Sequence, residues 1–116
     1  MALKERRLAF IGAGHITNII LDNLVKAEKL HTHRVIASDP EKNKLQRLYD
    51  KYEIIMAQDN IEAVDKGDFI FINVPPQAVG NVIGELSRKR LPENKVVVTL
   101  AAGIPIKAYK CLGDNT

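Results

Sequence analysis

Residues 8–20 carry the letters LAFIGAGHITNII, in which an apolar run is followed by two glycines and then by isoleucines at helical spacing. This order predicts a buried strand that turns sharply at Gly12 and continues into a helix. Gly12 would permit the tight turn, and Gly14 would let backbone N–H groups approach a phosphate without an intervening Cβ. The helix N-terminus adds partial positive charge at the same point. The segment therefore predicts a turn that binds the pyrophosphate of a dinucleotide, although glycine pairs also occur in plain structural turns.

The third position of this motif departs from the usual pattern, because Thr17 stands where glycine or alanine normally lets the helix pack closely on the strand. The departure predicts either a slightly displaced helix or a threonine hydroxyl that bonds locally. Strand, turn and helix still occur in the order that a dinucleotide site requires. Apolar residues at helical spacing should form the inner face of the helix, and they are Ile16, Ile19, Ile20, Leu24 and Ala27.

The composition is that of a single globular domain. The chain has 116 residues, of which 46% are hydrophobic and 27% charged, and its net charge is +3. The basic run from Lys4 to Arg7 is interpreted as a solvated lead-in to the first strand, and the sequence has no basic stripe with interleaved aromatic residues that would predict contact with nucleic acid. It has no apolar run long enough to predict a membrane span or a signal peptide, so a cytosolic or organelle-matrix protein is expected, and the location assigned is cytoplasmic.

The cysteine and histidine content predicts no metal site. Cys111 is the only cysteine, which excludes an internal disulfide and fits a reducing compartment, and we interpret it as a small packing residue. His31 and His33 lie two residues apart, but no cysteine or acidic cluster completes a ligand set, and both are expected at the surface. His15 lies beside the predicted phosphate site, where its backbone N–H rather than its ring is expected to contribute.

Short apolar runs alternate with helical segments along the rest of the chain, and this alternation predicts an α/β fold. Asp39 followed by Pro40 is the expected N-cap and first position of the second helix, and the turn 58–60 should cap the third. The fold class is a Rossmann-type doubly wound, mainly parallel sheet with flanking helices. Further strands are predicted at 34–38, 52–56, 69–74 and 95–100, and further helices at 40–50, 61–66 and 77–89.

In a doubly wound sheet the loops that follow the strands open on the carboxyl edge, where ligands bind. Four such loops are expected to converge there, at 12–17, Asp39, 73–76 and 101–103. Small residues in the first and last of these loops leave room for a ligand, which packing alone does not explain. Asn73 could touch a nicotinamide ring or merely cap the end of its strand. The candidate cofactor-binding residues of these loops are Gly12, Gly14, Thr17, Asn73 and Ala101.

Four motifs carry a family resemblance. FIGAGHI, ASDPEK, DFIFINVPPQAV and VVVTLAAGIPI follow one another in order, and over residues 8–112 they closely resemble the N-terminal domain of pyrroline-5-carboxylate reductases. The resemblance implies a reductase that transfers hydride from NAD(P)H to 1-pyrroline-5-carboxylate, giving L-proline. It implies further cofactor contacts at Ala13, His15, Ile16, Asp39, Asn60, Val74, Pro75 and Ala102.

The fold of that family continues into a connecting strand and a helical dimerisation domain, which supplies most of the imino-acid site. Residues 1–116 are therefore expected to be the NAD(P)-binding, N-terminal portion of a longer reductase, inactive alone and a homo-oligomer only with the missing domain. No catalytic residue is assigned. Two alternatives stay open: a stand-alone regulatory or redox-sensing dinucleotide module, and the cofactor domain of another dehydrogenase of the same superfamily.

Two departures from the family pattern bear on the choice between NAD(H) and NADP(H). The loop after the fourth strand has Val74-Pro75-Pro76 where Val-Lys-Pro is usual, and Asp39 replaces a phosphate-binding serine or threonine. Asp39 stands 22 residues after Thr17, where a carboxylate typically hydrogen-bonds the adenosine ribose, and this slightly favours NAD(H). The alternative is that Asp39 only caps the following helix, which leaves Lys42 or Lys44 free to hold a 2′-phosphate.

Overall fold

A computed structural model of the chain describes residues 6–88 and 95–99. The described part alternates strands with helices, as the sequence predicts. The strands are β1 (Leu8–Ile11), β2 (Val35–Ser38), β3 (Ile55–Met56), β4 (Phe69–Ile72) and β5 (Val96–Thr99). The helices are α1 (His15–Lys26), the 3-10 turn η2 (Thr32–Arg34), α2 (Lys42–Tyr52), α3 (Asn60–Lys66) and α4 (Pro76–Ser87).

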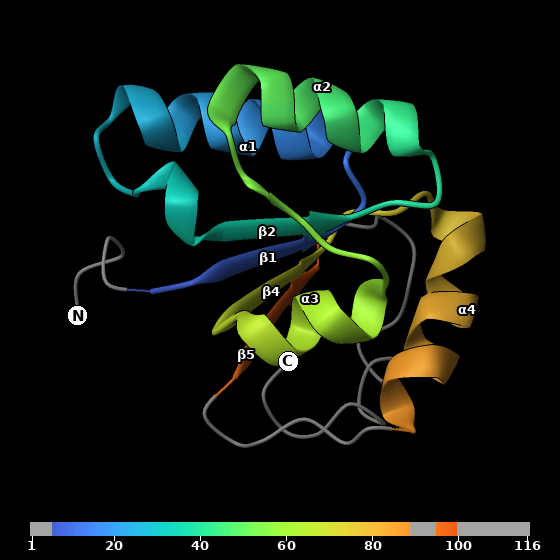
Figure 1. The fold of residues 1–116 in the computed structure, drawn as a ribbon. Helices are drawn as coiled ribbons and strands as arrows, with labels where there is room; N and C mark the ends of the chain where they lie inside the picture. Colours follow the sequence, from blue (N-terminus) through green and yellow to red (C-terminus); the bar gives the residue numbers. More distant parts are fainter. Residues whose placement is uncertain (1–5, 89–94, 100–116) are drawn as a thin grey trace.

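The strands form one parallel sheet in the order β3-β2-β1-β4-β5. β1 lies in the middle, with Leu8 opposite both Val35 of β2 and Phe69 of β4. Helices α1 and α2 cover one face of the sheet, and α3 and α4 cover the other (Figure 1). The predicted doubly wound fold is therefore confirmed, and the order of the strands reverses between β1 and β4.

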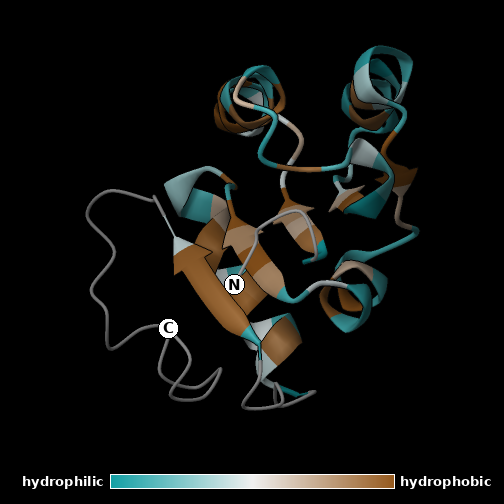
Figure 2. Ribbon diagram, turned by 90° about the vertical axis from the view of Figure 1, so that its left-hand side faces the viewer, coloured by the Kyte–Doolittle hydropathy of each residue, from teal (hydrophilic) through white to brown (hydrophobic). Residues whose placement is uncertain are grey.

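Each face of the sheet has its own core. Ala9 and Ile11 of β1 pack with α3 and α4, whereas Leu8 and Phe10 pack with α1 and α2, because successive side chains of a strand point to opposite faces. Phe10 stacks on Phe71 of β4, with ring centroids 4.8 Å apart. Figure 2 shows hydrophobic strands between helices with hydrophilic outer sides. Both faces of β1 are therefore buried, as a central parallel strand requires.

The inner face of α1 differs from the prediction. Thr17 and Leu21 are its buried residues, while Ile16 and Ile19 are 44% and 43% exposed. Ile20 and Leu24 are half-buried against the core, and Ala27 is exposed. The prediction was wrong for Ile16, Ile19 and Ala27 because it ignored a polar residue that is able to bond internally. The Thr17 hydroxyl donates to the carbonyl oxygen of Gly12, so Thr17 occupies the centre of the buried face.

The second helix also begins later than expected. α2 starts at Lys42 with Glu41 as its N-cap, so Asp39 is not the N-cap and Pro40 is not in the helix. At the other end α2 continues through Tyr52 and stops at Glu53, which has a left-handed φ of 56°. The predicted strand 52–56 is therefore reduced to Ile55–Met56.

The remaining boundaries lie close to those predicted from the sequence. The predicted capping turn at 58–60 is confirmed and its cap is Asp59, whose carboxylate accepts the backbone N–H of Glu62 at 2.8 Å. β4 ends at Ile72 rather than at Val74, and its Phe69 and Phe71 are only partly buried.

Two polar groupings tie elements together. Tyr52 at the end of α2 donates its hydroxyl to Asp22 of α1, and the Lys51 ammonium lies 3.0 Å from the same Asp22 oxygen. The bond from Tyr52 and the nearby Lys51 hold the pKa of the Asp22 carboxyl below its usual value, while burial raises the pKa of the Tyr52 phenol.

Next to β5, the Lys95 ammonium donates to three carbonyl oxygens at the end of α3, those of Val64, Asp65 and Gly67.

Candidate functional site

Three of the four predicted loops meet at the carboxyl edge of the sheet. The backbone N–H of Gly12 donates to the Ser38 carbonyl at 2.9 Å, and the N–H of Asn73 donates to the Ile11 carbonyl at 2.8 Å. The glycine turn therefore lies between the end of β2 and the end of β4. The fourth loop, which contains the predicted contacts Ala101 and Ala102, lies outside the described residues.

The two glycines of the turn have different roles. Gly12 has φ +106°, and a Cβ there would lie 2.6 Å from the Asn73 carbonyl oxygen, so this position is required by the fold itself. Gly14 has nothing within 4 Å of the point that its Cβ would occupy. It is the N-cap of α1, and among residues 6–88 and 95–99 no side chain caps this helix. Gly14 thus leaves open space beside a helix N-terminus that can accept an anion.

His15, Ile16 and Thr17 form the first turn of α1. The side chains of His15 and Ile16 are exposed, whereas that of Thr17 is completely buried. The Thr17 hydroxyl donates to the Gly12 carbonyl at 2.6 Å and accepts the Asn73 side-chain amide at 3.2 Å. The expected local bond of this hydroxyl is therefore confirmed. Thr17 braces the turn from the protein side, and the residue can face a ligand only through its backbone.

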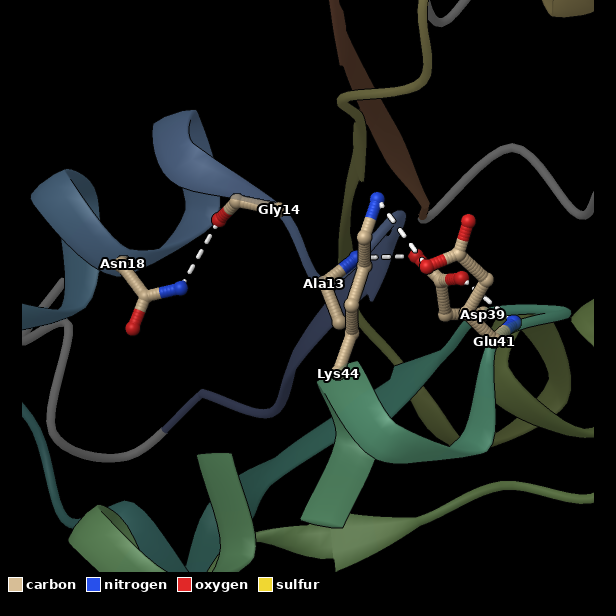
Figure 3. Close-up of polar contacts among 6 residues, drawn as sticks. All are labelled: Ala13, Gly14, Asn18, Asp39, Glu41 and Lys44. Carbon is tan, nitrogen blue, oxygen red and sulfur yellow. Dashed lines mark hydrogen bonds and ion pairs between the residues drawn. The ribbon is translucent and has the colours of Figure 1, made fainter. Parts of the chain in front are cut away.

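Asp39 is joined to the glycine turn. Its Oδ2 accepts the N–H of Ala13 at 2.8 Å and its Oδ1 accepts the N–H of Glu41 at 2.8 Å (Figure 3). These two bonds explain why Asp39 does not cap α2, because its carboxylate is held by the N–H groups of Ala13 and Glu41, ahead of the first helical residue Lys42. Lys44 makes an ion pair with Glu41, with 3.7 Å between Nζ and Oε2. In Figure 3 the Asn18 side chain also donates to the Gly14 carbonyl, at 2.9 Å.

Asn60 joins the site from the start of α3. Its Oδ1 accepts the Ser38 hydroxyl at 2.5 Å, and its Nδ2 donates to Glu85 Oε1 at 2.8 Å. Sequence reasoning missed both partners. A serine at the end of an otherwise apolar strand was a usable signal for Ser38, but Glu85, in the third turn of α4, had none. A cavity of about 260 Å³ beside this network is lined by Ser38, Asp39, Pro40, Gln58, Asp59, Asn60 and Glu85.

Val74 and Pro75 lead from β4 into α4. Val74 packs partly buried against the core on the α3 and α4 side, and Pro75 is the N-cap of α4. The Asn73 side chain next to them is fixed by Thr17, and its Oδ1 is buried without a partner in the described structure. A buried acceptor without a donor is costly, which marks Asn73 as a residue to test.

Other features of the described chain lie away from this edge or lack the geometry of a site. His31 and His33 are exposed with rings 5.3 Å apart, and within residues 6–88 and 95–99 no group of histidine, cysteine or acidic side chains could hold a metal ion. A cavity of about 350 Å³ lies at the opposite edge of the sheet, lined by Arg7, His33, Arg34, Ile36, Ile55 and Lys66.

None of the helices described is long and apolar enough to cross a membrane. Cys111 lies outside the described residues.

Comparison with known proteins shows which family the chain resembles. Residues 7–103 match the family model described as NADP oxidoreductase, coenzyme F420-dependent. A pyrroline-5-carboxylate reductase of Methanosarcina acetivorans is 28% identical over 93% of this chain and 40% of its own length. One of Pseudomonas aeruginosa is 33% identical over 85% of this chain and 36% of its own. The resemblance inferred from the four motifs is thereby confirmed.

A solved structure agrees in fold. The pyrroline-5-carboxylate reductase of Coxiella burnetii superposes with a TM-score of 0.84 and 22% identity, covering 94% of this chain and 40% of the other. The chain spans about 40% of the length of the curated relatives it matches.

Proposed function

The chain belongs to the family described as NADP oxidoreductase, coenzyme F420-dependent, and from this premise we propose that it is the nicotinamide-dinucleotide-binding domain of a reductase. The observation that carries the proposal is the open space at Gly14, at the uncapped start of α1 in the described chain. A forced turn at Gly12 and an open position two residues later are what a pyrophosphate site requires.

The pyrophosphate end of the site is built from backbone groups. The Ala13 N–H is already taken by Asp39, so the donors to the pyrophosphate are the amides of Gly14, His15 and Ile16. Thr17 acts as a positioning residue, because its buried hydroxyl holds the Gly12 carbonyl and so the shape of the turn. His15 is proposed to contribute its backbone N–H rather than its exposed ring.

The adenosine end is formed by Asp39 and Asn60. Each Asp39 oxygen accepts one backbone N–H and has capacity for a further donor, so the carboxylate is able to accept ribose hydroxyls while it holds the turn. A 2′-phosphate within about 4 Å of this carboxylate would be repelled by roughly 2 kcal/mol even at the dielectric constant of water. We therefore propose NAD(H) as the preferred cofactor, in contrast to the NADP of the family description.

The nicotinamide end is formed by Asn73, Val74 and Pro75, and the predicted contacts Ala101 and Ala102 lie outside the described residues. A bound nicotinamide dinucleotide supplies a hydride. The names of the relatives support 1-pyrroline-5-carboxylate as the imine that accepts it, with L-proline as the product. Because the relatives are more than twice as long as this chain, we propose this activity, and a homo-oligomer, for a protein in which this domain is joined to a helical dimerisation domain.

A cytoplasmic location is supported by the single cysteine.

Isothermal titration of the native chain with NADH and with NADPH tests the binding. One site per chain that is tighter for NADH is expected, and a chain that binds neither cofactor would refute the proposal. The substrate is tested separately in the protein that carries this chain, by following NADH oxidation on addition of pyrroline-5-carboxylate. If NADH still binds but is not oxidised there, the assignment of the substrate is refuted and the assignment of a dinucleotide-binding domain stands.

A further inference from the structure

Glu85 reaches the predicted adenosine end of the site from a distant part of the chain. It lies in the third turn of α4, and its Oε1 accepts the Asn60 side-chain amide at 2.8 Å. Asn60 in turn accepts the Ser38 hydroxyl at 2.5 Å. Ser38 is the last residue of β2 and only 2% exposed. Three elements, β2, α3 and α4, are thus joined through one carboxamide.

This arrangement fixes the orientation of the Asn60 side chain. A carboxamide turned by 180° would direct its oxygen at the Glu85 carboxylate, where two acceptors would face each other without a proton. It would also direct its NH2 group at the Ser38 hydroxyl. Glu85 therefore determines which end of the Asn60 amide faces α4 and which end faces β2. Hydrogen bonds to a charged partner are the stronger ones, so Glu85 is the dominant constraint.

The charge of the side chains that line the nearby cavity also argues against a 2′-phosphate. The cavity of about 260 Å³ is lined by three carboxylates, those of Asp39, Asp59 and Glu85, and by no lysine or arginine. Asp39 accepts the backbone N–H groups of Ala13 and Glu41, and Asp59 accepts that of Glu62. Within the described chain, Glu85 accepts from the Asn60 side-chain amide instead. Arg88, three residues after Glu85, is absent from this lining, although it lines a neighbouring cavity together with Asn60 and Glu85. A neutral group with hydrogen-bond donors suits this cavity, and a phosphate does not.

We propose that Glu85 is a positioning and specificity-determining residue of the dinucleotide site, acting from α4. It orients the Asn60 carboxamide for the adenosine ribose, and its charge adds to that of Asp39 in disfavouring a 2′-phosphate. The inference rests on the proposed dinucleotide binding and extends it to a residue outside the glycine turn and the loops that follow β2 and β4.

Two substitutions at one position separate orientation from charge. Glu85→Gln keeps an acceptor for Asn60 and removes the charge, so NADH affinity should stay within about twofold while NADPH binds about fivefold tighter. Glu85→Leu removes the acceptor as well, and NADH affinity should fall about tenfold. Glu28→Gln is the matched control for net charge, because exposed Glu28 lies beyond the far end of α1 and should change neither affinity. Titration calorimetry and the melting temperature of each variant are measured together.

A double-variant cycle completes the test. Adding Glu85→Leu to Asn60→Ala should weaken NADH binding no further than Asn60→Ala alone, because Glu85 acts on the ribose through Asn60. Additive losses, or a Glu85→Gln variant that matches Glu28→Gln for both cofactors, would overturn the role of Glu85 and leave the binding site intact. A native chain that binds no NADH would instead overturn the proposed function itself.

Discussion

The carbonyl oxygen of Asn73 lies 2.6 Å from the point that a Cβ on Gly12 would occupy. The turn after β1 and the end of β4 are therefore packed backbone against backbone, with no room for a side chain between them. Gly12 also has a φ of +106°, which L residues with a side chain rarely adopt. Fold and site thus share this contact, since the loop that carries Asn73 is held directly against the glycine turn.

Replacing Gly12 by alanine should destabilise the fold. We expect Gly12→Ala to lower the free energy of unfolding by about 3 kcal/mol, because steric overlap with Asn73 adds to the backbone strain. Urea unfolding measures the loss. Gly80→Ala in α4 is the control, since nothing lies within 4 Å of its Cβ position and alanine favours a helix there. If both variants unfold alike, the contact with Asn73 has no energetic importance.

Gly14 should behave in the opposite way. The Gly14→Val side chain enters open space, so the melting temperature should stay within a few degrees of native while dinucleotide binding is lost. Calorimetric titration with NADH, alongside a melting curve, checks both halves. Unchanged affinity in a folded variant would remove the glycine turn from the cofactor site.

Asp39 should control the choice of cofactor. The native chain is expected to bind NADH roughly thirtyfold tighter than NADPH, from the repulsion between the carboxylate and a 2′-phosphate. Asp39→Ser should bring the two affinities closer by strengthening NADPH binding. Its NADH affinity should also fall, because serine is too short to hold the Ala13 N–H as Asp39 does at 2.8 Å. Tighter NADPH than NADH binding by the native chain, or no gain for NADPH in the variant, would contradict the assignment.

The bond between Tyr52 and Asp22 should make stability depend on pH at both extremes. The pKa of Asp22 is lowered from 3.8 by Tyr52 and Lys51, so its contribution is present above that pH and is lost as the pH falls through the folded pKa. The pKa of Tyr52 is raised from 10.0 by burial and by Asp22, so its contribution is present below pH 10 and is lost as the pH rises further.

Tyr52→Phe tests this pH dependence. Near neutral pH the melting temperature should fall by about 4 °C, and the difference from native should shrink below pH 4 and above pH 10. Tyr49→Phe is the control, because Tyr49 is 44% exposed and should show no effect at any pH. A constant difference across the whole range would mean that Tyr52 acts through packing alone.

Lys95 should hold the start of β5 to the end of α3. Its ammonium lies 2.6 to 3.1 Å from three carbonyl oxygens at the end of α3. Lys95→Met keeps most of the apolar stem and removes the donors, so the free energy of unfolding should fall by about 2 kcal/mol. The same change at exposed Lys42 should have no measurable effect in the same urea titration. Equal stability of both variants would show that water replaces the ammonium at no cost.

The sequence predicted those parts of the fold that depend on local pattern. Leu8 to Ile11 and the glycines that follow gave the central strand and its turn, because an apolar run and conformational freedom are written in the residues themselves. The cap by Asp59 was found for the same reason, since its partner Glu62 is three residues away.

Long-range partners account for the errors and omissions. Asp39 resembled a helix cap because its actual partner Ala13 lies 26 residues away along the chain. The face of α1 was misplaced because the burial of Thr17 depends on bonds to Gly12 and Asn73. Glu85 was missed because nothing near it in the sequence indicates that it meets Asn60. In each case a polar side chain found its partner only once the sheet had assembled.

The central place of β1 has a consequence for how the chain folds as it is synthesised. β1 is synthesised before the other strands of the sheet, yet its second edge is paired only when β4 has been made. The backbone N–H of Arg7, just before β1, likewise bonds to Asp68, 61 residues later. Pairings at such separations fold slowly, and translation at about 5–20 residues per second adds seconds of delay. During that time β1 is able to pair only with β2, and one edge of an apolar strand stays open to other chains. We therefore expect aggregation during synthesis to be more sensitive to substitutions in Leu8–Ile11 than the stability of the finished domain would suggest.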